Sequence, residues 1–290
     1  MGKNIPVYSL NQFKKDSVRR KHYQVEVFDK NRNFKVEYPH RHDNFYEILF
    51  LTRGSGSYTI DFKTYPLHPY HVFFVSPGQV HSISFSEDIL GYIFLFTEEF
   101  YLLPKIDKNR LLDLPFFHGL TYENPPFRIP EPESISTLFE LICRETNRDS
   151  SVSDEIALSG LDLILTICKK NYPNREEHIT GKGRQLVRKF KQLIDQHINK
   201  MHLVQWYAGE LNVTSSHLNE SVKQLTGLTA KELIKERLII EIKRFLSHTE
   251  LNINEIAEAV SFEDQSYFSR FFKKNTGETP NEFRNRTFHQ

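Results

Sequence analysis

The sequence predicts an α+β chain in which a β-barrel, two middle helices and an all-α region follow one another. From about Val25 to Arg128, short β-branched and aromatic runs alternate with turn residues, which is typical of closely spaced strands. After the proline-rich stretch 125–132, apolar residues recur at a period of about 3.6 residues, as they do along amphipathic helices. Two segments near the end of the chain resemble each other at a spacing of 49 to 50 residues, and both have a helical pattern.

The composition is that of a globular protein. The chain has 290 residues, of which 39% are hydrophobic and 26% charged, and this length allows two domains. Its longest apolar runs, such as 92–96 and 161–168, are too short to span a bilayer, and its start carries no signal-peptide pattern. We therefore expect a cytoplasmic protein with no membrane partner. The net charge is +1, but residues from Thr180 onward hold 17 Lys and Arg against 13 Asp and Glu, which makes this part mildly basic.

The predicted strands follow one another closely. The main runs are Tyr46 to Leu51, Ser57 to Asp61, His71 to Val75 and Tyr92 to Phe96. Turn signals at residues 54–56 and 77–78 separate them. Short strands with turns between them indicate an all-β sandwich or a small barrel.

Two amphipathic helices are expected after the barrel. Their apolar positions are Ile135, Leu138, Leu141 and Ile142 on the first helix and Ile156, Leu161, Leu165 and Cys168 on the second. These helices either form a dimer seam or cover an open edge of the barrel, and the pattern does not separate the two arrangements. Cys143 and Cys168 are expected to be small buried apolar side chains.

The repeated C-terminal segments each predict a short helix, a tight turn and a longer helix. The short helices carry Ala208 and Ala257, the longer ones begin after the capping residues Thr214 and Asp264, and Gly227 and Gly277 end them. This is the helix-turn-helix pattern, in which the alanine lets the two helices cross closely and the second helix can enter a major groove.

The polar faces of the two longer helices hold the candidate DNA contacts. On the second, Tyr267, Phe268, Phe271 and Phe272 form the apolar half; on the first, Leu218, Val222 and Leu225 are buried. Gln and Arg pair with adenine and guanine edges, while Ser and Lys suit phosphates. The expected contacts are Ser215, Ser216, Asn219, Lys223, Gln265, Ser266, Tyr267, Ser269, Arg270, Lys273 and Lys274. Whether Glu220 contacts DNA stays open, because its carboxylate can accept a hydrogen bond from cytosine but repels phosphates.

Residues from about Gln205 to Arg284 resemble the DNA-binding domain of the AraC/XylS family of bacterial transcription regulators. The most specific match runs from Ile253 to Lys274 and continues at 276–280 and 283–284, and residues 237–246 resemble the family's connecting helix. The resemblance implies a regulator of transcription that binds double-stranded DNA. Three positions depart from the family pattern: Ser261 replaces a glycine, which predicts strain from a positive φ, Ile242 replaces an alanine, and Glu220 replaces a basic residue.

Two histidine motifs mark the β domain. His40 and His42, with Glu47 and Gly54 after them, resemble the first motif of the cupin barrels, and residues 76–81 resemble part of the second. In metal-binding cupins these positions supply three histidines and one glutamate. The same residues can instead contact a small molecule such as a sugar, or serve only the structure. We expect no cofactor and no metal; a metal, if present, would be held by His40, His42, Glu47 and His81. The candidate ligand contacts are His40, His42, Tyr46, Glu47, Tyr58 and His81.

The expected organisation is a cupin-like sensor domain over residues 1–132, a helical dimerisation segment over 133–172, a linker over 173–183 and a double helix-turn-helix domain over 184–290. The leading hypothesis is a ligand-responsive regulator, not an enzyme, that acts as a homodimer, with RNA polymerase as a further candidate partner. The alternative is a metal-dependent cupin enzyme fused to a DNA-binding domain. A third reading has a sensor domain that binds nothing and serves only for dimerisation.

Overall fold

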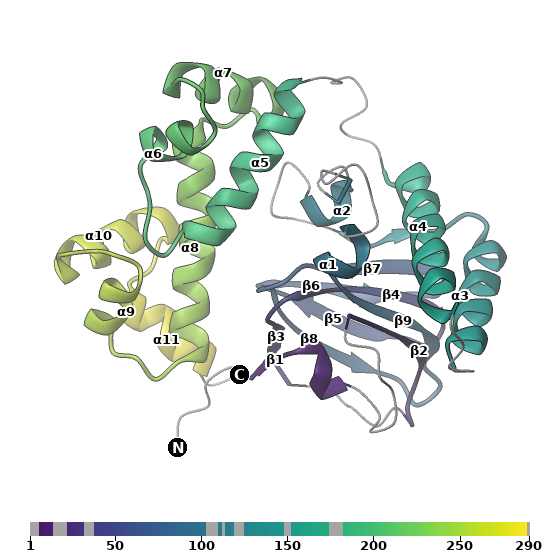
Figure 1. Ribbon diagram of the computed structural model, residues 1–290. Helices are drawn as coiled ribbons and strands as arrows, with labels where there is room; N and C mark the ends of the chain where they lie inside the picture. Colours follow the sequence, from purple (N-terminus) through teal and green to yellow (C-terminus); the bar gives the residue numbers. More distant parts are fainter. Residues whose placement is uncertain are drawn as a thin grey trace. The chain divides into compact units, whose positions relative to one another are not determined.

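The computed structural model describes residues 6–13, 22–31, 38–102, 110–111, 114–118, 125–147, 152–173 and 182–288. These residues form two compact units, one made of the described residues between 6 and 173 and the other of those from 182 onward (Figure 1). In the first unit the chain is mainly strands followed by two helices, and in the second it is helical throughout its described length. None of the helices in the described ranges is both long and apolar enough to cross a membrane.

The first unit contains two five-stranded sheets (Figure 1). One has the strand order β1 (Val7–Tyr8), β3 (His40–His42), β8 (Val80–Phe85), β5 (Gly56–Ile60) and β6 (Lys63–Leu67). The other has the order β10 (Phe127–Arg128), β7 (His71–Val75), β4 (Phe45–Arg53), β9 (Leu90–Thr97) and β2 (Tyr23–Asp29). Neighbouring strands run antiparallel except for the parallel pair β1 and β3. The main predicted runs coincide with β4, β5, β7 and β9 to within two residues at each end, which confirms them.

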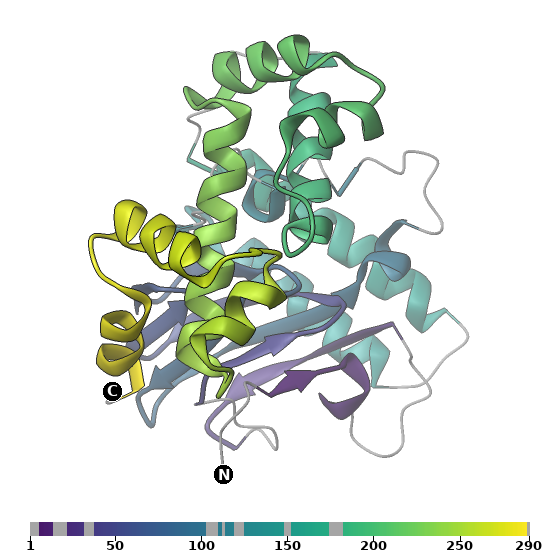
Figure 2. The ribbon, with the colours of Figure 1, turned by 90° about the vertical axis from the view of Figure 1, so that its left-hand side faces the viewer.

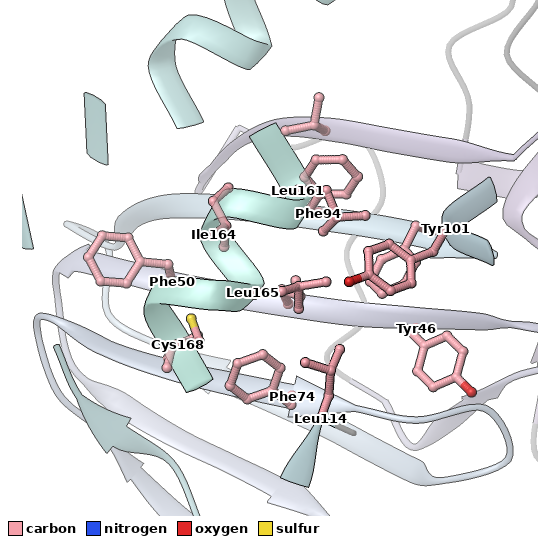
Figure 3. Packing of buried hydrophobic residues seen from close by; sticks show 14 of the residues in the cluster. Tyr46, Phe50, Phe74, Phe94, Tyr101, Leu114, Leu161, Ile164, Leu165 and Cys168 are labelled. Atoms are coloured by element: carbon pink, nitrogen blue, oxygen red, sulfur yellow. The ribbon is translucent and has the colours of Figure 1, made fainter. Parts of the chain in front are cut away.

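Strand β4 is buried on both faces, and its side chains point alternately into two separate apolar clusters. Phe45, Leu49 and Leu51 belong to a cluster that joins both sheets, whereas Tyr46, Ile48 and Phe50 belong to a second cluster shared with helices. The second cluster is shown in Figure 3, where Tyr46, Phe50, Phe74 and Phe94 lie near residues 161–168 of a helix. A continuous apolar strand of this kind is expected wherever both faces of a sheet are covered.

Two long helices supply the outer layer of the first unit. They are α3 (Pro132–Thr146) and α4 (Ser153–Asn171), and the short elements η1 (Leu10–Phe13), α1 (Glu98–Leu102) and α2 (Pro115–His118) complete the unit. A Cβ on Gly160 of α4 would lie 2.4 Å from the side chain of Ile142 on α3, so glycine allows this close approach. Leu141, one of the predicted apolar positions, is 39% exposed, because the buried stripe of α3 runs through residues 135, 139, 142 and 143.

The second unit consists of α5 (Lys182–His197), α6 (Val204–Glu210), α7 (Ser215–Thr226), α8 (Ala230–His248), α9 (Ile253–Ala259), α10 (Gln265–Thr276) and α11 (Pro280–Phe288). The long helix α8 runs between the pair α6 and α7 and the pair α9 and α10 (Figure 2). One apolar cluster includes residues from all seven helices. A shared core of this kind holds both helix pairs on α8.

Candidate DNA-binding face and buried histidine cluster

The pairs α6–α7 and α9–α10 are built from the same local devices. The side chains of Thr214 and Asp264 accept hydrogen bonds from the backbone N–H groups of His217 and Tyr267, which caps the first turns of α7 and α10. Both helices end at a glycine in the left-handed region, with φ of 74° at Gly227 and 88° at Gly277. The predicted caps and end points are therefore confirmed.

The turns between the paired helices need a positive φ at one residue. Asn212 has φ of 54° and Ser261 has φ of 55°, which confirms the strained geometry predicted for Ser261. Asparagine tolerates this region better than serine, because its short amide side chain bonds locally. The Ser261 hydroxyl donates to the carbonyl of Asn199 at 2.9 Å, which ties the second turn to the segment after α5. The buried Ala208 and Ala257 lie in the helices before these turns, as predicted.

Helix α10 presents a basic and polar face to solvent. Phe268 and Phe272 are fully buried in the domain core. Six of the predicted contacts on this helix are exposed, namely Gln265, Ser266, Tyr267, Arg270, Lys273 and Lys274, and Ser269 is partly buried. Tyr267 is 57% exposed, so its assignment to the apolar half is wrong: it lies on the solvent side, with its ring centroid 5.8 Å from that of Phe262.

Helix α7 presents a face of different chemistry. Leu218 and Val222 are buried as expected, and Ser216, Glu220 and Lys223 are exposed, while Ser215 is partly buried. Asn219 is also partly buried, and its side-chain oxygen accepts a hydrogen bond from the backbone N–H of Ala230 at 3.0 Å. This bond satisfies one of the open donors at the start of α8, a role that the helical pattern did not reveal.

An ion network whose α8 members are buried joins α8 to α5 through the half-exposed Asp195. Arg237 donates to Asp195 at 2.6 Å and to Glu241 at 2.9 Å, and Arg244 donates to Glu241 at 3.0 Å. Burial alone would raise the pKa of Glu241, but the charges of Arg244 and Arg237 outweigh it and hold this pKa below its ordinary value. The spacing of the three α8 residues, three and four apart, was the available sequence signal for this network.

Three histidines meet between the two sheets of the first unit. His40 and His42 lie two residues apart on β3 and so share one face, and His81 on β8 is the direct register partner of His40. The ring centroids are 4.1 Å apart for His40 and His81 and 4.4 Å apart for His42 and His81. All three side chains are at most 2% exposed, and each offers a ring nitrogen within 4.8 Å of the others.

Glu47 and Tyr58 complete this cluster, and Tyr46 does not join it. The second carboxylate oxygen of Glu47, on β4, lies 3.8 Å from Nε2 of His42 and 3.9 Å from Nε2 of His81. Tyr58, on β5, donates its hydroxyl to the first carboxylate oxygen at 2.6 Å. Tyr46 points to the opposite face of β4, where its ring stacks on Phe96. The structure thus brings together five of the six predicted ligand residues.

The Nδ1 atoms of His40 and His81 form hydrogen bonds with backbone carbonyls. Nδ1 of His40 bonds to the carbonyl of Tyr38 at 3.0 Å, and Nδ1 of His81 bonds to the carbonyl of Gln79 at 3.1 Å. A carbonyl only accepts, so Nδ1 carries the proton in both rings and the Nε2 lone pair faces the cluster. Burial lowers the pKa of His81 to about 4, against the opposing effects of the Gln79 hydrogen bond and the Asp61 charge.

Comparison with known proteins matches both units. Residues 23–161 match the AraC-like ligand binding domain, and residues 207–286 match a helix-turn-helix domain. The chain is 22% identical over 248 residues to the HTH-type transcriptional activator RhaR of Salmonella schwarzengrund, covering 84% of this chain and 86% of that protein. It is 27% identical over 239 residues to the Arabinose operon regulatory protein of Salmonella typhimurium, covering 82% and 83%. Among solved structures, ToxT of Vibrio cholerae aligns over 91% of this chain and 95% of its own at 18% identity, with a TM-score of 0.43.

The two matched domains define a DNA-binding regulator of transcription that also carries a ligand-binding domain. The chain belongs to the AraC family of transcription regulators. The regulator hypothesis is thereby supported over that of a cupin enzyme fused to a DNA-binding domain.

Proposed function

We propose that the chain recognises specific double-stranded DNA sequences mainly through α10, with α7 as a second and weaker contact helix. The observation that carries this proposal is the exposed face of α10, which combines Gln265 and Arg270 with two lysines and no acidic side chain. An arginine pairs with a guanine edge through two hydrogen bonds, and a glutamine does the same with adenine. The neighbouring helix α9 packs against α10 and leaves this face exposed.

The remaining predicted contacts are assigned by their chemistry. Ser266, Ser269, Lys273 and Lys274 suit phosphate oxygens, and the exposed Tyr267 suits a phosphate or a sugar edge. On α7, Ser216 and Lys223 are exposed and suit phosphates, with Ser215 near them. Asn219 already bonds to the start of α8 through its oxygen, so we assign it only the contacts that its amide N–H₂ can donate.

The first unit, in this proposal, binds a small-molecule effector. One similar protein is named for the arabinose operon, which makes a sugar the first effector class to test. A ligand can change DNA affinity only by as much as its affinities differ between two arrangements of the protein. We further propose that the protein is a cytoplasmic homodimer whose two copies contact each other through residues 133–172. It works with RNA polymerase and catalyses no reaction. The sensor domain then spans residues 1–132, the linker 173–183 and the DNA-binding domain 184–290.

The test of DNA recognition is a binding titration with the full-length chain. Labelled duplexes from upstream of its own gene and shuffled duplexes of the same composition are compared at several salt concentrations. We expect one or more upstream duplexes to bind at least tenfold more tightly, with affinity that falls as salt rises because lysine and arginine displace counterions. Equal affinity for upstream and shuffled DNA at every salt concentration contradicts the proposal.

A further inference from the structure

The two helix-turn-helix pairs are joined by α8, and both also contact the chain between α5 and α6. We call this connection, residues 198–203, the brace segment. It leaves the end of α5, passes beside the turn between α9 and α10, and then enters α6 (Figure 1). Ile198 is buried in the apolar cluster that all seven helices share, and Met201 packs against that cluster. The brace segment is therefore part of the packed domain.

Tyr207 of α6 fixes the brace segment to the first pair. The Tyr207 side chain is fully buried, and its hydroxyl donates to the carbonyl of Met201 at 2.7 Å. Its ring also packs edge to face on Phe190 of α5, with the ring centroids 5.5 Å apart. A short hydrogen bond at the edge of a close-packed core holds its partners in one geometry. The brace segment therefore keeps a fixed position relative to α5 and α6.

Two contacts fix the brace segment to the second pair. The Ser261 hydroxyl donates to the carbonyl of Asn199 at 2.9 Å. The ring of His202 lies against that of Phe262, with the ring centroids 5.8 Å apart. Nε2 of His202 in turn donates to the carbonyl of Ile198 at 2.8 Å, which holds the imidazole in this position. Both contacts reach the turn that precedes α10.

Phe262 carries these contacts to the recognition helix. Its ring centroid lies 5.4 Å from that of Phe268 and 5.3 Å from that of Phe271, both on α10. Phe268 is fully buried in the core of the domain. Because close-packed side chains transmit displacements, a shift of the turn against the brace segment also shifts α10.

A second connection between the pairs matters because α8 is long. It has 19 residues, and at about 1.5 Å per residue it is roughly 28 Å long. A helix pair held on such a helix alone can turn about its axis, or tilt as the helix bends. The brace segment lies beside α8, so its contacts resist this turning (Figure 2). Two half-sites one DNA turn apart are about 34 Å apart, so a small turn displaces α10 from its groove.

The strained backbone of Ser261 fits a role in this connection. Its φ of 55° lies in the left-handed region, which glycine adopts without steric cost. A glycine at this position would remove the strain, but it would also remove the hydroxyl that bonds to Asn199. The serine thus combines a backbone that is costly for its own turn with a link to the first pair.

We propose that the brace segment positions the second helix-turn-helix pair relative to the first, so that α7 and α10 reach two half-sites of DNA at one fixed spacing. Ser261 and His202 are the positioning residues, and they act through the turn before α10. Such preorganisation raises affinity, because the second pair need not be ordered when the first has bound. The use of the brace in DNA recognition rests on the proposed function, whereas the brace itself is a property of the free protein.

The first test measures the distance between the two pairs in the full-length chain without DNA. Spin labels are attached to Gln224→Cys on α7 and Lys274→Cys on α10, both exposed positions, and pulsed electron paramagnetic resonance gives the distance distribution. Cys143 and Cys168 are buried, and burial raises the pKa of both thiols. The labels therefore react with the introduced cysteines.

We expect a narrow distance distribution in the labelled parent chain and a broader one when Ser261→Gly or His202→Ala is added. The melting temperature of Ser261→Gly should stay unchanged or rise, because glycine adopts the positive φ without strain. The matched control is Asn212→Gly, since Asn212 is exposed and has nearly the same φ, 54°, at the turn of the first pair. This control should leave the distance distribution unchanged.

The second test measures the spacing that the protein requires in DNA. The upstream duplex that wild type binds most tightly is mapped by base substitution, and about one or two base pairs are then inserted between its half-sites. Wild type should prefer the original spacing. In Ser261→Gly and His202→Ala this preference should fall about threefold to tenfold, the range expected for the net contribution of a hydrogen bond. Affinity for a duplex trimmed to the α10 half-site should stay unchanged.

An unchanged distance distribution in both variants would overturn the proposed brace, and so would an unchanged spacing preference in both. If His202→Ala fails to fold, Ser261→Gly decides, because glycine suits this backbone position. If wild type binds no upstream duplex specifically, the proposed DNA recognition fails, while the distance distribution still tests the brace in the free protein.

Discussion

The two helix-turn-helix pairs of the second unit share one scaffold but present different faces. Both have a capped recognition helix, a closing left-handed glycine and a turn residue with φ near 55°. On their exposed faces, however, α10 carries Arg270, Lys273 and Lys274, whereas α7 carries Lys223 beside Glu220. The fold constrains the residues at buried and capping positions, while the residues at exposed positions are free to diverge. The duplicated pattern therefore predicts two similar scaffolds. Only the exposed residues indicate which of the two helix pairs contacts bases.

The largest expected effect is a loss of stability when the ion network on α8 is broken. It tests whether both helix-turn-helix pairs need this connecting helix for their stability. Glu241→Ala leaves Arg237 and Arg244 buried without their shared carboxylate, and it should lower the free energy of unfolding by about 3–5 kcal/mol. Chemical denaturation followed by the fluorescence of Trp206, the one tryptophan of the chain, measures this loss. The exposed Glu236→Ala on the same helix is the control, with an expected loss under about 1 kcal/mol.

The same network carries a pH dependence of known sign. Because the folded-state pKa of Glu241 lies below its ordinary value of 4.5, its stabilising contribution is complete above that value and is lost as pH falls through the lowered pKa. The difference in stability between wild type and Glu241→Ala should therefore shrink on acidification below about pH 4.5. A difference that grows on acidification would contradict the assigned charge state.

The next effect separates the two pairs as readers of DNA. Arg270→Ala should weaken operator binding by about 1–3 kcal/mol and relax the preference at one base pair, as expected for the loss of a guanine contact. Glu220→Ala should leave affinity unchanged or raise it, because a negative charge near phosphates is removed. Titration of both variants against operators substituted at each position measures the outcome. A comparable loss in Glu220→Ala, confined to one base pair, would make α7 an equal reader.

A smaller effect compares the two helix caps. Asp264→Ala and Thr214→Ala should each cost about 0.5–2 kcal/mol of stability, since each leaves a backbone donor of the first turn without its cap. The loss at Asp264 should be the greater by about 0.3–1 kcal/mol, because its carboxylate also interacts with the positive end of α10. Urea denaturation measures both, and Asp264→Asn serves as the control that keeps the cap without the charge. An equal loss in Asp264→Asn would assign the whole effect to charge.

The smallest effect concerns the lysines of both recognition helices. Lys274→Ala and Lys223→Ala should each lower the slope of log affinity against log salt by about one, and weaken binding to all sequences alike. Filter binding or fluorescence anisotropy at several salt concentrations measures the slope, with the exposed Lys169→Ala of the first unit as control. A change in base preference, with an unaltered slope, would instead give the lysine a role in reading bases.

Much of the second unit could be predicted from the sequence because its signals are local. Caps at Thr214 and Asp264 and the closing glycines each act within a few residues, and all were confirmed, whereas the apolar period of α10 misplaced Tyr267. The roles of Asn219 and Glu241 could not be predicted in this way. Asn219 bonds to a residue eleven positions away on another helix, and Glu241 belongs to a network that reaches Asp195 on α5.

The sequence by itself determined the order of elements, the duplicated helix pairs and the histidine motifs, because strand alternation, helical period and capping chemistry depend on near neighbours. Only the tertiary structure decided which side of β4 each residue occupies. It directs Glu47 toward the histidines and Tyr46 toward the helical layer, since successive side chains of a strand point to opposite faces. The convergence of His40, His42, Glu47 and His81 likewise depends on the pairing of strands from two sheets, which joins residues that lie up to 41 positions apart in the chain.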